Sequence, residues 1–91
     1  MLTLQVENRF KKDIKKLRRA GSYDFSELNN VIDKLVNKKN LPAKYKNHIL
    51  IGKLKGYFDC HIKDNWVLLY KLTDEELILV RTGTHADVLG L

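Results

Sequence analysis

The first residues of the chain have the pattern of a strand followed by a helix. Residues 2–6 alternate apolar and polar side chains with period two, which predicts a strand at the edge of a sheet. Phe10, Ile14 and Leu17 then follow at the spacing of one apolar stripe along a helix, and Gly21 is a typical helix end. The other side of this expected helix is basic, with Lys11, Lys12, Lys15, Lys16, Arg18 and Arg19.

A second helix is expected from Asp24 onward. Asp24 and Glu27 stand three residues apart, the spacing of a capping box with the aspartate as the cap. The helix that follows would have a broad apolar face, made of Leu28, Val31, Ile32, Leu35 and Val36. Pro42 then rules out a continuous helix, so the residues around it are expected to form a loop.

The second half of the chain has the period of strands joined by tight turns. Its strand-like segments are residues 49–56, read as a short strand that leads to a turn at Gly56, and residues 57–63, 66–72 and 77–83. The chain is therefore predicted to be one α+β domain over residues 1–91. Its sheet would have three or four antiparallel strands with an N-terminal edge strand added, and the two helices would cover one face.

Alternation within residues 57–63 assigns side chains to the two faces of the sheet. Phe58, Cys60 and Ile62 share one face, which we expect to pack against the helices, so His61 lies on the open face. Cys60 is then a small buried residue. Arg81 has the parity of the core residue Leu79, so alternation alone does not place it on the open face.

Composition indicates a cytoplasmic protein with a polyanionic partner. The chain has no apolar run of membrane-spanning length, a single cysteine and no secretion-signal pattern at its start. The formal net charge of +6 suits nucleic acid or an acidic protein, and charge does not choose between them.

The histidines are candidates for proton-transfer chemistry. The spacings of His48, His61 and His85 match no metal-ligand signature, so no metal site is predicted. Cleavage of RNA through its 2′-hydroxyl group needs a base and an acid, and histidine serves as either near neutral pH. Arg81 would bind the phosphate. Trp66 would either stack on a base or belong to the core.

Several motifs together resemble a known family. "HILIGKLKGY", "CHI", "WVLLYKL" and "LVRTGTH" are similar to the RelE superfamily of bacterial toxins, in its YafQ-type branch, over residues 45–89. The resemblance implies a RelE-like fold and a ribosome-dependent endonuclease that cuts mRNA in the ribosomal A site without a metal or other cofactor. It also implies the toxin half of a toxin–antitoxin pair.

The resemblance also assigns residues to the site. His48, His61, Trp66 and His85 match active-site positions, with His85 as the general acid and Arg81 at the phosphate. Lys53 and Lys55 would line the substrate groove.

Two positions depart from the family pattern. The family has Pro-Asp before the tryptophan, where this chain has Asp64 and Asn65, so either Asp64 substitutes as a catalytic residue or the histidines act alone. An aromatic residue that would stack on a base is replaced by Leu89. Weaker cleavage or an altered codon preference is therefore expected.

The resemblance implies the ribosome, mRNA and an acidic antitoxin as partners. The antitoxin would bind operator DNA, which this chain would reach only through the complex. No membrane is implied.

Two other functions compete with cleavage. One is a module that binds RNA or the ribosome without cutting, through the basic helix, or a co-repressor that acts with its antitoxin. The other is a ParE-like inhibitor of DNA gyrase, against which the three histidines argue because that branch lacks them.

Overall fold

The computed structural model of the chain describes residues 1–90. Five strands, three α-helices and two short 3-10 helices follow one another in the order β1 (Thr3–Val6), α1 (Asn8–Ala20), α2 (Phe25–Val36), η1 (Ala43–Tyr45), β2 (His48–Ile49), η2 (Gly52–Leu54), β3 (Tyr57–Lys63), β4 (Trp66–Leu72), β5 (Glu76–Thr84) and α3 (His85–Leu89).

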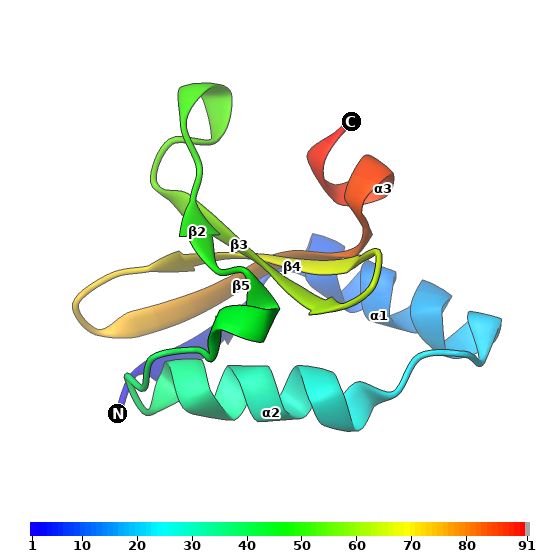
Figure 1. Cartoon of the computed structure of the whole chain (residues 1–91), viewed down its shortest axis with the longest axis horizontal. Helices are drawn as coiled ribbons and strands as arrows, with labels where there is room; N and C mark the ends of the chain where they lie inside the picture. Colours follow the sequence, from blue (N-terminus) through cyan, green and yellow to red (C-terminus); the bar gives the residue numbers. More distant parts are fainter. Residues whose placement is uncertain (91) are drawn as a thin grey trace.

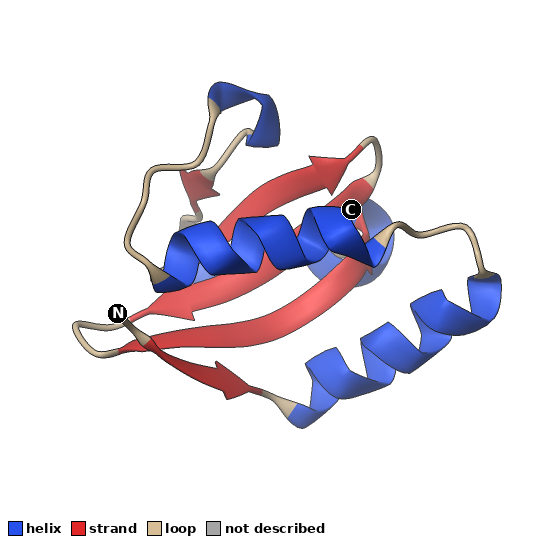
Figure 2. Cartoon of the chain, turned by 90° about the horizontal axis from the view of Figure 1, so that it is seen from below, coloured by secondary structure: helices blue, strands red, loops and turns tan. Residues whose placement is uncertain are grey.

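The strands form one sheet in the order β1-β5-β4-β3-β2. Strands β2 to β5 pair antiparallel, and β1 joins at the edge, parallel to β5. Helices α1 and α2 lie on one side of the sheet, and α3 rises on the other (Figure 1). Seen from the helix side, α2 crosses the strands while α1 runs beside them (Figure 2). The predicted α+β fold, with its N-terminal edge strand, is confirmed.

Two apolar clusters lie on the two faces of the sheet. The larger lies between the sheet and the two long helices, and its strand residues include Cys60, Leu68 and Tyr70. The smaller lies under α3 on the open face and consists of Val67, Leu69, Val80 and Val88. Alternation in β3 is as predicted, because Cys60 is fully buried on the helix side. Burial raises the pKa of the Cys60 thiol to about 12.

Trp66 belongs to the larger cluster. Its side chain is buried, its ring meets Tyr23 and Phe25 edge-on, and its Nε1 donates to the Thr82 hydroxyl at 2.8 Å. Trp66 thus has the position of a core tryptophan, because the indole finds both apolar neighbours and a hydrogen-bond acceptor in the interior. Stacking of Trp66 on an RNA base stays a prediction.

The helix starts agree with the sequence in part. Asp24 caps α2 by accepting from the Ser26 backbone N–H at 3.0 Å. The hydrogen bond from the Ser26 hydroxyl, and then this backbone bond, lower the pKa of Asp24. Glu27, expected to complete a capping box, instead accepts from the Tyr45 hydroxyl at 3.3 Å.

Two elements of the second half differ from expectation. The predicted strand over residues 49–56 is reduced to His48–Ile49, and the rest forms the turn of η2. The chain after β5 forms α3, which the hydrophobic pattern did not indicate. Among the described residues, no helix has the length and apolarity that a membrane crossing requires.

Candidate active site

The three histidines meet on the open face of the sheet. His48 in β2 lies opposite Asp59 in β3, and His61 lies two residues further along the same strand and face. His85 enters from the start of α3, and its ring centroid lies 6.0 Å from that of His61. Segments far apart in the sequence therefore place three imidazoles and one carboxylate together.

Asp59 is the member of this cluster that sequence reasoning missed. Its side chain is 1% exposed, and neither carboxylate oxygen has a well-directed hydrogen bond from the described residues. The close contact to Oδ1 is His48 Nε2 at 2.7 Å, an ion-pair distance with oblique geometry. A buried carboxylate without hydrogen bonds is unusual outside functional sites. The signal was present in the sequence, because Asp59 shares the strand face of His61.

His48 is held in a fixed orientation. Its Nδ1 lies 2.8 Å from the carbonyl oxygen of Lys46. A carbonyl only accepts hydrogen bonds, so Nδ1 carries a proton and Nε2 is the nitrogen that faces Asp59. These two contacts therefore fix the orientation of the His48 ring beside Asp59.

His85 is positioned by the turn before Trp66. Its backbone N–H donates to Asn65 Oδ1 at 3.2 Å, and the Thr84 hydroxyl caps the helix by accepting from the Asp87 N–H at 3.1 Å. The departure at Asn65 thus has a structural role, since an amide oxygen accepts this bond as a carboxylate would.

Asp64 takes a different position. It lies exposed in the turn between β3 and β4, with a φ of 49°. It lines a hollow together with Tyr23 and Asp24 from the connection between α1 and α2. The structure thus groups Asp64 with these residues and not with the histidines, and a catalytic role for Asp64 stays a prediction.

Arg81 is turned by a β-bulge. Leu69 lies opposite Arg81 whereas Tyr70 lies opposite Leu79, so Val80 is an extra residue in β5. The bulge changes the alternation, and Arg81 shares the side of Leu69 in place of the core side.

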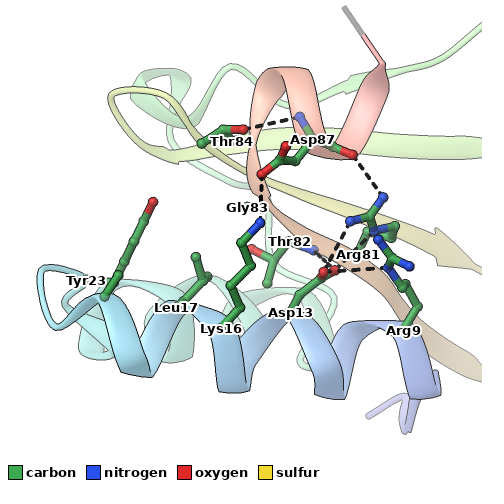
Figure 3. Close-up of a pocket in the computed structure, with 11 residues that line it drawn as sticks. Arg9, Asp13, Lys16, Leu17, Tyr23, Arg81, Thr82, Gly83, Thr84 and Asp87 are labelled. Carbon is green, nitrogen blue, oxygen red and sulfur yellow. Dashed lines mark hydrogen bonds and ion pairs between the residues drawn. The ribbon is translucent and has the colours of Figure 1, made fainter.

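The Arg81 guanidinium is already bound within the protein (Figure 3). Its Nε and Nη2 each donate to a carboxylate oxygen of Asp13 at 3.1 Å, and Nη1 donates to the Asp87 carbonyl at 2.9 Å. Three of the five N–H groups of a guanidinium are thereby used. A phosphate contact by Arg81 stays a prediction that depends on the remaining two.

The other predicted substrate contacts lie around the open face. Lys53 and Lys55 are exposed on the η2 turn, which rises on the same side of the sheet as α3 (Figure 1). Leu89 is half-buried and packs against the smaller apolar cluster.

The cluster also has the donor set of a metal site. One ligand atom each of Asp59, His61 and His85 lie within 4.8 Å of one another. Imidazole nitrogens with a carboxylate oxygen suit zinc or copper ions. The sequence spacings gave no hint of this, because the ligands come from β3 and α3.

Comparison with known proteins shows the family of the chain. The family model described as bacterial toxin of type II toxin–antitoxin system, YafQ, matches residues 2–90. The mRNA interferase toxin YafQ of Escherichia coli strain K12 is 41% identical over 88 residues, covering 96% of this chain and 95% of that protein.

Solved structures are similar over nearly the whole chain. A copper-bound mutant toxin from Helicobacter pylori superimposes with a TM-score of 0.91 at 41% identity, covering 97% of this chain and 99% of that one. The toxin in the E. coli DinJ–YafQ complex gives a TM-score of 0.87 at 40% identity, covering 99% and 100%. The chain therefore belongs to the YafQ family of bacterial toxins of type II toxin–antitoxin systems.

Proposed function

We propose that this chain is an mRNA interferase that cuts mRNA in the ribosomal A site by attack of a 2′-hydroxyl group on the adjacent phosphate. The observation that carries the proposal is the meeting of His48, His61, His85 and Asp59 on one open sheet face. The E. coli relative at 41% identity is named an mRNA interferase. Proton-transfer groups and exposed lysines on one side of the sheet suit a polyanionic substrate.

The proton-transfer roles follow from the partners of each histidine. In His48, Nδ1 contacts the Lys46 carbonyl oxygen and Nε2 contacts Asp59. Neither nitrogen is therefore well placed to take a proton from the substrate. His61 is half-buried beside Asp59 and is the base in this proposal. His85 stands at the start of α3 and protonates the leaving 5′-oxygen. Asp59 stabilises the imidazolium that forms on His61.

Cations on the same side of the sheet as the cluster would bind the phosphate as charge develops on it. Arg81 has two N–H groups left, and Lys53 and Lys55 lie exposed on the η2 turn. Each cation stabilises developing negative charge more strongly in a site from which water is excluded. Leu89 offers an apolar surface where a base would rest.

The partners of this chain are part of the proposal. The toxin of the E. coli complex is bound to the protein DinJ, and a net charge of +6 suits an acidic antitoxin here. The antitoxin would bind operator DNA, with this chain as co-repressor. Ribosome and mRNA complete the set, and the cytoplasm is where all of these meet.

A metal at the cluster would compete with this mechanism. An ion on Asp59, His61 and His85 would occupy the imidazole nitrogens that the mechanism uses for protons. We therefore propose cleavage without a metal, and activity in the presence of a chelator distinguishes the two situations.

The test is a reconstituted translation reaction with one defined message, with and without a chelator selective for transition metals. Attack by the 2′-hydroxyl group predicts fragments that end in a 2′,3′-cyclic phosphate and begin with a 5′-hydroxyl. It also predicts that one 2′-deoxy nucleotide at the cut position abolishes cleavage there. The chelator should leave the rate unchanged.

Three results would contradict the proposal. Loss of cleavage on chelation would make the metal essential. Cleavage of the 2′-deoxy message would exclude the 2′-hydroxyl as nucleophile. Inhibited translation with intact message would favour the non-cleaving binding module, in which the exposed basic side of α1 holds RNA.

A further inference from the structure

Helix α3 depends on its surroundings for its position. It spans only His85–Leu89, and a helix of five residues is not stable alone. Its contacts to the rest of the molecule are therefore what place His85. They include the buried Val88 side chain, the bond from the His85 N–H to Asn65, and the bond from Arg81 to the Asp87 carbonyl.

The contact through Arg81 leads to the far layer of the molecule. Asp13 lies in the middle of α1, on the helix side of the sheet, and receives Nε and Nη2 of Arg81 at 3.1 Å each. The same guanidinium donates to the Asp87 carbonyl at 2.9 Å. Figure 3 shows the side chain standing between α1 and α3, with these bonds along the wall of a small cavity. Arg81 therefore connects the two helices directly.

Asp13 is fixed by more than this pair. Strand β1 covers the edge of β5 only along Glu76–Leu79, and beyond it the Thr82 N–H donates to Asp13 Oδ2 at 3.1 Å. The Asp13 side chain is only 9% exposed, although it lies in the apolar stripe of α1 between Phe10 and Leu17. A carboxylate held by a backbone N–H and a two-pronged guanidinium has little freedom to move.

A second link between the two helices is weaker. Lys16 of α1 reaches the Asp87 carboxylate at 3.4 Å, but both side chains are more than half exposed. Exposed ion pairs fix geometry poorly. The partly buried, two-pronged contact between Asp13 and Arg81 is thus the stronger connection between α1 and the helix that begins with His85.

We propose that Asp13 is a positioning residue for catalysis, which holds Arg81 in the orientation that fixes α3 and thereby sets His85 against the scissile phosphate. The inference rests on the proposed function for its catalytic consequence only. The placement of α3 by Asp13 is a statement about the free protein, and it is testable without any substrate.

The test combines backbone ¹⁵N relaxation with single-turnover cleavage on the ribosome, for the wild-type chain and the variant Asp13→Asn. An asparagine amide group places a donor against a donor of Arg81, so the two-pronged contact is lost while the side-chain size is kept. The order parameters of the α3 amides should fall from about 0.85 to below about 0.6, with the sheet unchanged. The cleavage rate should fall by about 10- to 100-fold, the cost of a displaced catalytic group, at unchanged ribosome affinity.

A second variant keeps the test decisive if Asp13→Asn unfolds. In Arg81→Lys the charge opposite Asp13 remains, but one ammonium cannot span Asp13 and the Asp87 carbonyl as the planar guanidinium does. It should loosen α3 in the same way. Combining both substitutions should loosen α3 no further, because residues that act in one chain of contacts are not additive.

The matched control is Arg9→Ala. Arg9 also faces Asp13, at 3.8 Å, but its side chain is 62% exposed, so its loss should leave α3 and the cleavage rate unchanged. Ordered α3 amides in both Asp13→Asn and Arg81→Lys would overturn the proposal, as would a loss of order spread evenly over the chain in Arg81→Lys. If the wild-type chain fails to cleave, the proposed function falls, and the relaxation data still decide the role of Asp13.

Discussion

At the scale of single residues, Asp59 is the group on which the proposed chemistry depends most. Its carboxylate is fully buried, faces His48 and His61, and has no well-directed hydrogen bond among the described residues. Burial of such a group costs free energy of folding, so its presence indicates a function.

Asp59→Asn is expected to lower the cleavage rate by about 100-fold, within the range for groups that support general acid–base steps. Its effect on the melting temperature should be small, because removal of a buried charge and loss of the contact with His48 Nε2 act in opposite directions. The two measurements are single-turnover cleavage and thermal unfolding. Equal cleavage rates for Asp59→Asn and wild type would remove Asp59 from the mechanism.

Cys60, unlike its neighbour Asp59, is a buried titratable group to which the proposed mechanism gives no role. Burial and the neighbouring Asp59 raise its pKa to about 12, so less than about one thiol in 1,000 is ionised at pH 8. The native protein should therefore resist alkylation by iodoacetamide at pH 8 and react rapidly once unfolded in urea. Mass spectrometry of the alkylated protein measures both, and fast labelling of the native form would show that the thiol is accessible.

Side-chain orientation was predictable where strands are regular. Alternation in β3 correctly separated Cys60 from His61. The same reasoning could not place Arg81, because the bulge at Val80 changes which face of the sheet the next side chain lies on. No residue type in β5 indicates that bulge. Trp66 could not be decided either, since its burial depends on Tyr23, Phe25 and Thr82 from distant positions.

At the scale of elements, the turn between β3 and β4 and the start of α3 form one unit. Asn65 Oδ1 accepts from the His85 N–H, so the turn sets where the last helix begins. Asn65→Ala removes this acceptor and should slow cleavage about fivefold, the equivalent of one hydrogen bond of about 1 kcal/mol.

The conservative variant Asn65→Asp should restore the rate, since a carboxylate oxygen also accepts. The comparison is made by single-turnover cleavage. An unchanged rate in Asn65→Ala would mean that His85 is placed by its other contacts. A slow Asn65→Asp would mean that the amide group itself is required.

Trp66 joins β4 to β5 through Thr82 and should matter for folding. Trp66→Phe loses one buried hydrogen bond and some packing, so it should lower the free energy of unfolding by about 1–3 kcal/mol. At a temperature where the variant is folded, cleavage should be nearly unchanged. Urea unfolding and cleavage assays measure the two effects. A stable variant with strongly reduced cleavage would restore the base-stacking role.

Element prediction succeeded where the patterned segment is long and failed where the element is short. The helices from Asn8 and Phe25 and the strands β3, β4 and β5 have clear apolar patterns. Residues 49–56 were wrongly predicted as a strand, since Gly52 adopts a positive φ and starts a turn. Helix α3 exists through contacts to Asn65, Arg81 and the apolar cluster, none of which is local in sequence.

At the scale of the whole molecule, the two faces of the sheet carry different kinds of residues. The helix face holds the larger apolar cluster and with it most of the fold. The open face carries the histidines, and α3 and the η2 turn rise beside them (Figure 1). The α+β architecture follows from patterning alone, whereas the site forms only when β2, β3 and α3 are brought together.

The most direct test of the histidine-based nuclease is to measure mRNA cleavage in a reconstituted translation reaction for wild type and His85→Ala at equal ribosome occupancy. We expect cuts at discrete codons with wild type and a reduction of about 100-fold or more with the variant, because the general acid is lost. Equal cleavage by both proteins would contradict the account and remove His85 from the chemistry.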